Sequence, residues 1–316
     1  MFRAKIGTEL VGRVAAIDCG TNSIRLLIAD IEGNNFREIF RTMEIVRLGQ
    51  GVDLNKQFDP VAIERTLHAV TEFAAEIRRR GASQIRFCAT SATRDAANRD
   101  LFIDGVKEIL GVSPEVISGD EEAKLSFQGA IREMHPSDAP FLVVDIGGGS
   151  TEFVYGSSQV EAARSVNIGC VRMSERHLKS APPNQVAIEG AIADIDAAIE
   201  AAASEVPIKN AKTLIAVAGT ATTVAAAGLG LANYDREQIH LSRISSNKVH
   251  EIADSFLKSN REDLAALGYM HPGRVDVIAA GALILDRVLA KSGATEFVAS
   301  ESDILDGIAW SIASQS

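Results

Sequence analysis

One short unit occurs twice in this chain and constrains its fold more than any other feature. In the first copy, the apolar run 14–18 ends in the turn 18–23, DCGTNS, and a second apolar run covers 24–28. In the second copy, the run 141–145 ends in the turn 145–150, DIGGGS, and a strand pattern resumes at 153–155. One constant offset aligns Asp, Gly and Ser of the two turns. Each copy predicts strand, tight polar turn and strand, and their repetition indicates an internal duplication.

Helix and strand patterns alternate between and after the two hairpins, which favours α/β layers. Asp59 and Pro60 are typical of a helix start, and the apolar stripe that follows predicts a helix over 60–80 that ends at Gly81. Asp120 is the expected N-cap of a helix at 121–134. The remaining patterns predict strands at 85–89, 115–117, 162–167, 213–217 and 296–299, and helices at 98–110, 183–203, 274–291 and 303–313, with another opening near Gly219.

Length and charge bound the class of protein. A chain of 316 residues exceeds the size at which one hydrophobic core usually stops growing, so we expect two domains, 1–125 and 126–301. It has no run of about 18 uncharged apolar residues, and residues 1–12 carry charges in place of a signal-peptide core, so we expect a cytoplasmic protein without a membrane segment. A formal net charge of −10 argues against broad adhesion to nucleic acid or anionic membranes. An anionic ligand would therefore need a local pocket lined with arginine.

Several other chemistries find little support in the sequence. Cys19, Cys88 and Cys170 are far apart, odd in number and without CxxC spacing, which argues against a disulfide framework and a zinc site. The six histidines form neither an HExxH motif nor a ligand cluster, and no GxSxG elbow occurs. Zinc hydrolysis and serine nucleophile chemistry are therefore not expected.

The duplicated turns themselves are suited to phosphate. Glycine lets backbone N–H groups approach an anion closely, and two such turns facing one cleft would grip a phosphate chain, whereas a lone GGG turn would equally well be a sharp hairpin. Asp18 and Asp145 stand at strand ends, where carboxylates hold hydrated magnesium through oxygen ligands. The copies differ where Arg25 in the first corresponds to Glu152 in the second. This asymmetry fits one catalytic centre, with cations and amides for phosphates and carboxylates for metal and water.

Five segments resemble, in their order along the chain, the exopolyphosphatase and guanosine pentaphosphate phosphohydrolase family. They are the first hairpin and the segments 89–94, 117–124, 144–152 and 217–222, and the resemblance covers nearly the whole chain. It implies an α/β fold of the actin-like, acetate and sugar kinase superfamily, with two ribonuclease-H-like domains around a central cleft. In that fold the C-terminal helix, here about 302–316, returns to the first domain.

The resemblance also implies the catalytic groups. The general base is implied to be the second glutamate of a Gly-x-Glu-Glu motif, Glu122, which would deprotonate water for in-line attack on the terminal phosphorus. Adjacent helix positions point about 100° apart, so Glu121 and Glu122 cannot both face one water, and we favour Glu122. Helix-dipole stabilisation in a first turn is the alternative role for both.

The family pattern further implies the ligands of metal and phosphate. Mg²⁺, or Mn²⁺, is expected near Asp145, Gly147 and Glu152, with Asp18 as a further candidate. Arginine suits phosphate because its planar fork binds two oxygens at once. The phosphate ligands are expected to come from the two turns and from nearby side chains: Gly20, Thr21, Asn22, Ser23, Arg25, Arg94, Gly148, Gly149, Ser150 and Thr220.

The resemblance leaves more than one substrate open. Inorganic polyphosphate, in short chains, and guanosine pentaphosphate present the same terminal phosphoanhydride. Longer members carry additional helical domains that help bind long polyphosphate, and this sequence ends without them. Gly219 is followed by Thr220 where kinases and actins of the superfold usually receive adenosine through a Gly-Gly pair, which argues against adenine binding. A phosphotransferase or a non-catalytic nucleotide sensor would also be compatible with the same superfold, and a homodimer is expected.

Overall fold

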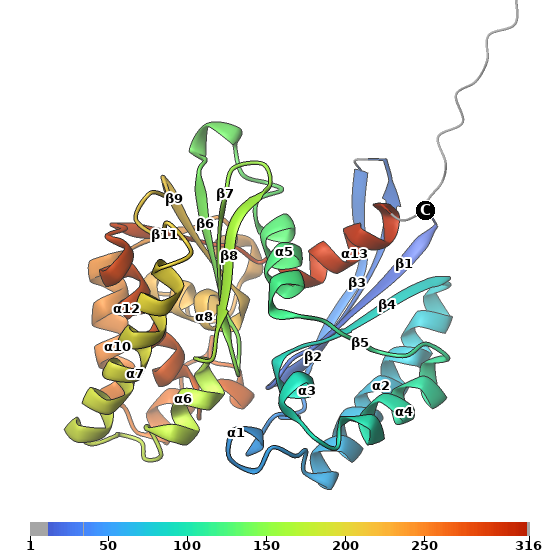
Figure 1. Ribbon diagram of the computed structural model, residues 1–316, viewed down its shortest axis with the longest axis horizontal. Helices are drawn as coiled ribbons and strands as arrows, with labels where there is room; N and C mark the ends of the chain where they lie inside the picture. The colour runs from blue at the N-terminus through green and yellow to red at the C-terminus, as the bar shows by residue number, and fades with distance from the viewer. Residues whose placement is uncertain (1–11, 34, 315–316) are drawn as a thin grey trace, which may run out of the picture.

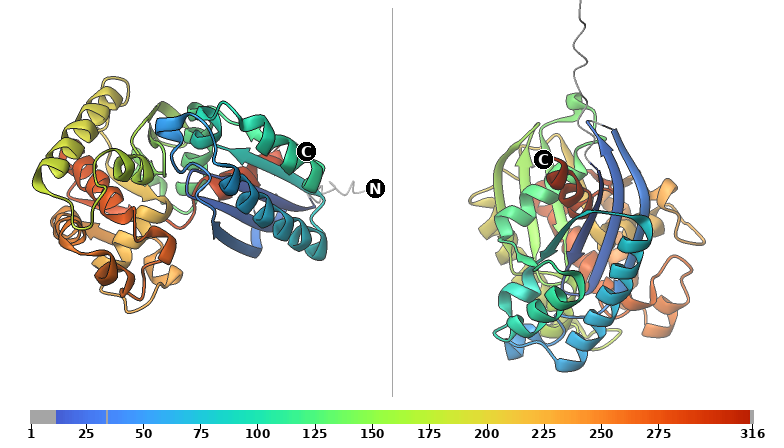
Figure 2. Two further views of the ribbon diagram at one scale, coloured as in Figure 1. Left: turned by 90° about the horizontal axis from the view of Figure 1, so that it is seen from below. Right: turned by 90° about the vertical axis from the view of Figure 1, so that its right-hand side faces the viewer.

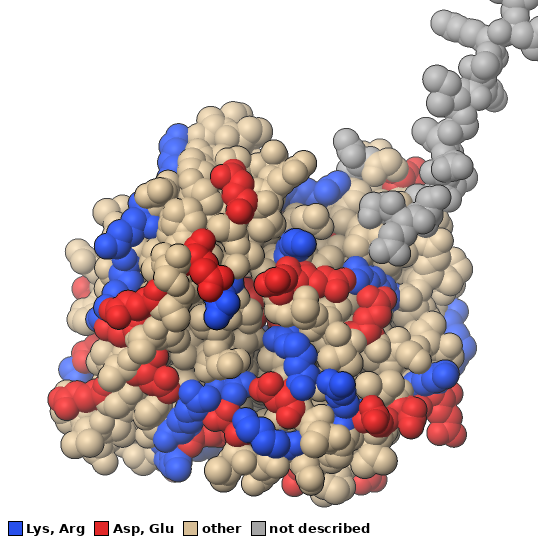
Figure 3. Space-filling model, viewed as in Figure 1, with Lys and Arg blue, Asp and Glu red and all other residues tan. Residues whose placement is uncertain are grey.

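Two mixed β-sheets flanked by helices stand side by side in the computed structural model, which describes residues 12–33 and 35–314 (Figure 1). The predicted lack of a signal peptide falls on residues 1–12, of which 1–11 lie outside the described part. Within the described ranges, no helix is both long and apolar enough to cross a membrane. Figure 3 shows acidic and basic side chains intermixed over the face in view.

The first sheet has the strand order β3-β2-β1-β4-β5. β1 is antiparallel to β2 and parallel to β4. Nearly every β1 residue is buried, because helices cover both faces of the sheet. The strands are β1 (Arg13–Cys19), β2 (Ser23–Glu32), β3 (Asn35–Ile45), β4 (Gln84–Ala89) and β5 (Glu115–Val116), and the helices α1 (Val52–Asn55), α2 (Pro60–Arg80), α3 (Ser91–Asp95) and α4 (Arg99–Leu110).

The second sheet repeats this plan with one added strand. Its order is β10-β11-β9-β6-β7-β8, so that β8-β7-β6-β9-β11 corresponds to β3-β2-β1-β4-β5. The predicted α/β class with two ribonuclease-H-like domains is confirmed by this repeated order. The strands are β6 (Phe141–Ile146), β7 (Thr151–Gly156), β8 (Val160–Val166), β9 (Thr213–Val217), β10 (Arg243–Ser245) and β11 (Glu296–Ala299).

The helices of the second half pack around one apolar core on its sheet. They are α6 (Cys170–Arg176), α7 (Gln185–Ala203), α8 (Ala218–Gly228), α9 (Arg236–Ile239), α10 (Ser246–Lys258), α11 (Arg261–Ala265) and α12 (Ile278–Ser292), with 3₁₀ turns at Pro136–Asp138 and Pro272–Arg274.

Two further helices, α5 (Gly119–Ala130) and α13 (Ile304–Ser314), lie between the sheets (Figure 1 and Figure 2). α13 packs on β1, β2 and β4, whereas α5 contacts α13 and the strands β6, β7 and β8. The two helices cross closely at two glycines. A Cβ at Gly129 would overlap the Asp303 carbonyl, and a Cβ at Gly307 would overlap the Leu125 carbonyl. These glycines therefore allow one compact layer to connect the two halves.

Some predicted element boundaries are wrong. The N-cap of α5 is Ser118, whose hydroxyl accepts from the Glu121 N–H at 3.2 Å, so Asp120 lies inside the helix, which ends at Ala130. The helix expected from 274 begins at Ile278, after a 3₁₀ turn in which the His271 ring accepts from Gly273 N–H. β3 and α10 were not predicted, and neither were β10, α6 and the short helices α1, α3, α9 and α11. β3 is an edge strand without a fully buried residue, so it lacks the apolar alternation that marks a strand.

Candidate active site

A cleft of about 770 Å³, including its opening to solvent, lies where the carboxyl ends of β1 and β6 meet. Both duplicated turns line it, together with side chains from α3, α5 and the start of α8. Twelve of the predicted site residues lie along it: Asp18, Gly20, Thr21, Asn22, Ser23, Arg25, Glu122, Asp145, Gly147, Gly148, Ser150 and Thr220. Glu121, Arg94, Gly149 and Glu152 are not among its lining residues.

The two turns have the same internal geometry. Gly20 N–H donates to the Ser23 carbonyl at 2.9 Å, and Gly147 N–H donates to the Ser150 carbonyl at 3.0 Å. They also touch, because a Cβ at Gly148 would come within 2.8 Å of the Thr21 side chain. Glycine is therefore required there for the turns of the two domains to meet.

The carbonyls of the second turn are turned toward α6. Cys170 N–H donates to the Gly147 carbonyl at 2.9 Å, and Val171 N–H donates to the Gly148 carbonyl at 2.9 Å. In a planar trans peptide the carbonyl and the following N–H point in opposite directions. The N–H groups of Gly148 and Gly149 therefore face away from α6, as an anion-binding turn requires.

Glu122 is a buried carboxylate in the first turn of α5. Its Oε2 accepts from Arg94 Nη1 at 2.7 Å, and the same nitrogen donates to the Ile117 carbonyl at 2.9 Å. Burial raises the pKa of Glu122, while the charge and hydrogen bond of Arg94 act in the opposite direction. Arg94 thus holds the carboxylate in place without lining the cleft itself.

Glu121, the neighbouring glutamate, belongs to a different surface. Its Oε1 accepts from Arg86 Nη2 at 2.5 Å, and Arg86 also binds Glu115. The structure therefore brings Glu122 to the cleft and directs Glu121 elsewhere, as the 100° offset between adjacent helix positions requires.

The cross-strand pairs next to the turns differ in charge. Asp18 lies opposite Arg25 in the β1–β2 pair, and Asp145 lies opposite Glu152 in the β6–β7 pair. Asp18 accepts two hydrogen bonds from Arg25, at 2.7 and 3.0 Å. Both acidic groups of the second pair instead accept from serine: Asp145 from Ser126 and Glu152 from Ser165, each at 2.7 Å. The first pair is neutralised internally, and the second carries two carboxylates.

The Asp145 and Glu152 carboxylates fit a hard divalent cation. Both are buried, and neither forms an ion pair with a lysine or arginine of the described ranges. Burial raises the pKa of each, and the charge of Glu122 raises both further. No group of three or more His, Cys, Asp or Glu in the described part is arranged to hold a metal. A bound Mg²⁺ would therefore rely mainly on water and substrate oxygens, as this ion usually does.

Two arginines contribute positive charge to the cleft. Arg25 Nη1 binds Asp303, so the guanidinium predicted to bind phosphate is held between Asp18 and Asp303. Arg274 was not predicted as a site residue, because it belongs to no motif. Its Nη2 donates to Met43 Sδ at 3.8 Å, and no acidic side chain of the described residues pairs with it. Burial lowers the pKa of Arg274, and a cleft anion would supply the missing counter-charge.

A second cavity of about 1,210 Å³, including its opening to solvent, adjoins the cleft and shares Arg25, Gly219 and Arg274 with it. Its other lining residues include the aromatic groups Tyr234 and Tyr269. A Cβ at Gly219 would overlap the Arg274 guanidinium, so glycine is needed for the arginine to lie between the two spaces.

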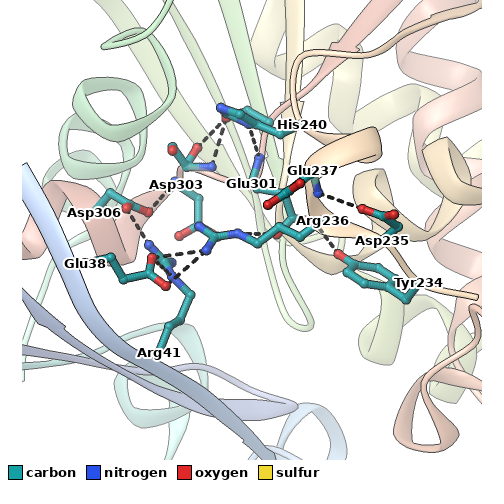
Figure 4. Close-up of polar contacts among 12 residues, drawn as sticks. Glu38, Arg41, Tyr234, Asp235, Arg236, Glu237, His240, Glu301, Asp303 and Asp306 are labelled. Carbon is teal, nitrogen blue, oxygen red and sulfur yellow. Dashed lines mark hydrogen bonds and ion pairs between the residues drawn. The ribbon is translucent and has the colours of Figure 1, made fainter.

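A polar network borders this cavity and joins the two halves (Figure 4). Arg236 Nη1 donates to Glu38 at 3.1 Å, and Arg41 binds both Glu38 and Asp306. Tyr234 donates to Glu301. β3, α9 and the segment that leads into α13 are thus connected by charged groups.

Comparison with known proteins agrees with this architecture. The model of the Ppx/GppA phosphatase family matches residues 27–312. Exopolyphosphatase 2 of Mycobacterium tuberculosis is 45% identical over 95% of this chain and 98% of its own length. A guanosine-5'-triphosphate,3'-diphosphate pyrophosphatase of Photobacterium profundum is 34% identical over 68% of this chain and 41% of its own length. The crystal structure of an exopolyphosphatase-like protein superimposes with a TM-score of 0.92 at 44% identity, over 96% of this chain and 99% of that one. The chain belongs to the Ppx/GppA phosphatase family.

Proposed function

We propose that this protein is an exopolyphosphatase that releases terminal orthophosphate from short chains of inorganic polyphosphate. The observation that carries the proposal is the cleft itself, where two glycine turns face the buried carboxylate of Glu122. The 45% identical relative named exopolyphosphatase supports the substrate class.

The oxygen of a water molecule bonds to the terminal phosphorus, the bridging P–O bond breaks, and the shortened chain leaves as an anion; the protein's own groups bind the phosphates and take up the water's proton. The guanidinium of Arg274 binds the phosphate oxygens together with N–H groups of the two turns other than those of Gly20 and Gly147, which donate within their own turns. Glu122 accepts a proton from the attacking water, and its raised pKa favours that transfer. Arg94 keeps the Glu122 carboxylate directed at the cleft. A divalent cation such as Mg²⁺ or Mn²⁺, held by Asp145 and Glu152, would neutralise charge on the phosphate oxygens.

Guanosine pentaphosphate is the second candidate substrate. The aromatic cavity beside the cleft favours it, because that space would receive a nucleoside while the phosphates occupy the turns. The Photobacterium relative is named a guanosine-5'-triphosphate,3'-diphosphate pyrophosphatase. A cytoplasmic location and a homodimer remain predictions from the sequence.

The experiment is phosphate release with Mg²⁺ from short polyphosphate, long polyphosphate, guanosine pentaphosphate and ATP. We expect the highest kcat/KM on short polyphosphate, and a fall of about 100-fold or more in kcat for Glu122→Gln, the scale of a lost general base. Glu121→Gln is the matched control, and we expect it to remain within about 2-fold of the unmodified protein because Glu121 pairs with Arg86 outside the cleft. Near-normal turnover of Glu122→Gln would refute the mechanism, and preference for guanosine pentaphosphate would select the second substrate.

A further inference from the structure

The second phosphate-binding turn depends on α6 for its orientation. Two of its carbonyls accept from the first N–H groups of α6, and the third, of Gly149, accepts from Arg172 Nε at 2.6 Å. Gly169 permits this approach, because a Cβ there would overlap the Gly148 carbonyl. Only the Gly149–Ser150 peptide is therefore oriented by a side chain.

Arg172 contacts both domains through one buried guanidinium. Nη2 donates to Asp95 Oδ2 of α3 at 2.6 Å, and Nη1 binds Asp53 of α1. Both aspartates belong to the first domain, whereas Gly149 belongs to the second. The Arg172 side chain is only 7% exposed, so these contacts are shielded from water. One planar fork therefore joins the phosphate turn to α1 and α3 of the first domain.

The turn needs such a restraint, because consecutive glycines have no Cβ to limit peptide rotation. If the Gly149–Ser150 peptide rotated by half a turn, its carbonyl would replace the Ser150 N–H at the anion-binding side. If the first domain moved away, Arg172 would lose both Asp53 and Asp95 and keep only the Gly149 carbonyl. The turn also packs against this domain, since a Cβ on Gly149 would lie 2.8 Å from Ser91 Oγ.

We propose that Arg172 is a positioning residue that makes the phosphate-binding orientation of the 147–150 turn depend on contact between the two domains. It acts through Gly149 and does not touch the substrate. The inference rests on the proposed phosphohydrolase function and adds to it a link between domain contact and phosphate affinity.

The first test compares Arg172→Lys with Arg176→Lys. Lysine keeps the charge but cannot bond three partners in the directions of the guanidinium fork. Arg176 is the matched control, because it also binds Asp53, at 2.7 Å, yet has no contact with the turn. We expect Arg172→Lys to weaken inhibition by inorganic phosphate and to lower kcat/KM by about 10-fold to 100-fold, the scale of a lost charged hydrogen bond. Arg176→Lys should remain within about 3-fold.

The second test separates positioning from folding. Asp95→Asn keeps the bond from Arg172 to Gly149 and weakens only the link to the first domain. We expect it to weaken phosphate inhibition by a few-fold with an unchanged thermal midpoint, and to have little further effect in the Arg172→Lys background. If Arg172→Lys does not fold, Asp95→Asn alone decides the matter.

Equal phosphate inhibition in the folded Arg172→Lys and Arg176→Lys proteins, or unaltered phosphate affinity in Asp95→Asn, would overturn the inference. Calorimetric titration with inorganic phosphate keeps this result distinct from failure of the proposed function. A protein that releases no phosphate from any of the four substrates can still show, or lack, the dependence of phosphate binding on Arg172.

Discussion

The crossing of α5 and α13 predicts that Gly307→Ala destabilises the protein although alanine favours helices. Alanine gains about 1 kcal/mol over glycine in a helix interior. At Gly307, however, the new Cβ would overlap the Leu125 carbonyl, which belongs to the backbone of α5 and cannot move without the helix. Overpacking of this kind costs about 1–3 kcal/mol, and a backbone obstacle places the cost at the upper end. We therefore expect a net loss of about 2 kcal/mol in the free energy of unfolding.

Gly105→Ala is the matched control in α4. Its Cβ would meet Leu67 Cδ1 at 2.6 Å, the end of a half-buried flexible side chain that can change rotamer. This variant should be neutral or gain up to about 1 kcal/mol from helix propensity. Urea unfolding followed by far-ultraviolet circular dichroism measures both. A Gly307→Ala protein as stable as the unmodified protein, or as stable as Gly105→Ala, would refute the argument that packing against a backbone carbonyl outweighs propensity.

Three further predictions concern ion pairs and the proposed divalent cation. Arg25→Gln leaves the buried carboxylates of Asp18 and Asp303 without their shared cation, so we expect a loss of about 3–5 kcal/mol in urea unfolding, and a loss below about 1 kcal/mol would contradict the role of Arg25 as their counter-ion. Chelation of divalent cations should abolish phosphate release and Mg²⁺ should restore it, whereas full activity in excess chelator would exclude the proposed cation. The hydrogen bond from Arg13 lowers the pKa of Asp30 to about 2, so this pair stabilises the fold above about pH 4 and loses its effect as the pH falls toward 2. Asp30→Asn should therefore reduce the free energy of unfolding at pH 6 by less than about 1 kcal/mol, because the pair is partly open to solvent, and should have almost no effect below about pH 2.

The duplicated hairpins made the centre of both sheets predictable. A buried strand that ends in a glycine turn has a strong local pattern, and its repetition indicated a repeated unit before any contact was known. β3 lacked such a pattern, because its side chains are half-exposed at a sheet edge. The start of α12 was misplaced because proline and histidine at 271–272 form a 3₁₀ turn that apolar spacing does not reveal.

The residues of the cleft and its surroundings also divide into those with a local sequence pattern and those without one. The two turns and Asp145 belong to contiguous motifs that can be read from the residues themselves, whereas Glu122 was selected through the resemblance to a known family. Arg172 and Arg274 depend on partners far along the chain: Asp53 lies 119 residues from Arg172, and Met43 lies 231 residues from Arg274. Single arginines without a local pattern cannot be distinguished from surface cations until folding brings those partners together.

The unequal pairs Asp18–Arg25 and Asp145–Glu152 have a consequence for a substrate that is itself symmetric. A linear polyphosphate has two identical ends, and a cleft with two identical walls would accept it in either direction with equal energy. The two sides of this cleft differ, because Arg25 is balanced by Asp18 and Asp303, whereas Asp145 and Glu152 have no cationic partner among the described residues. The two directions of binding therefore differ in energy, and one of them is favoured.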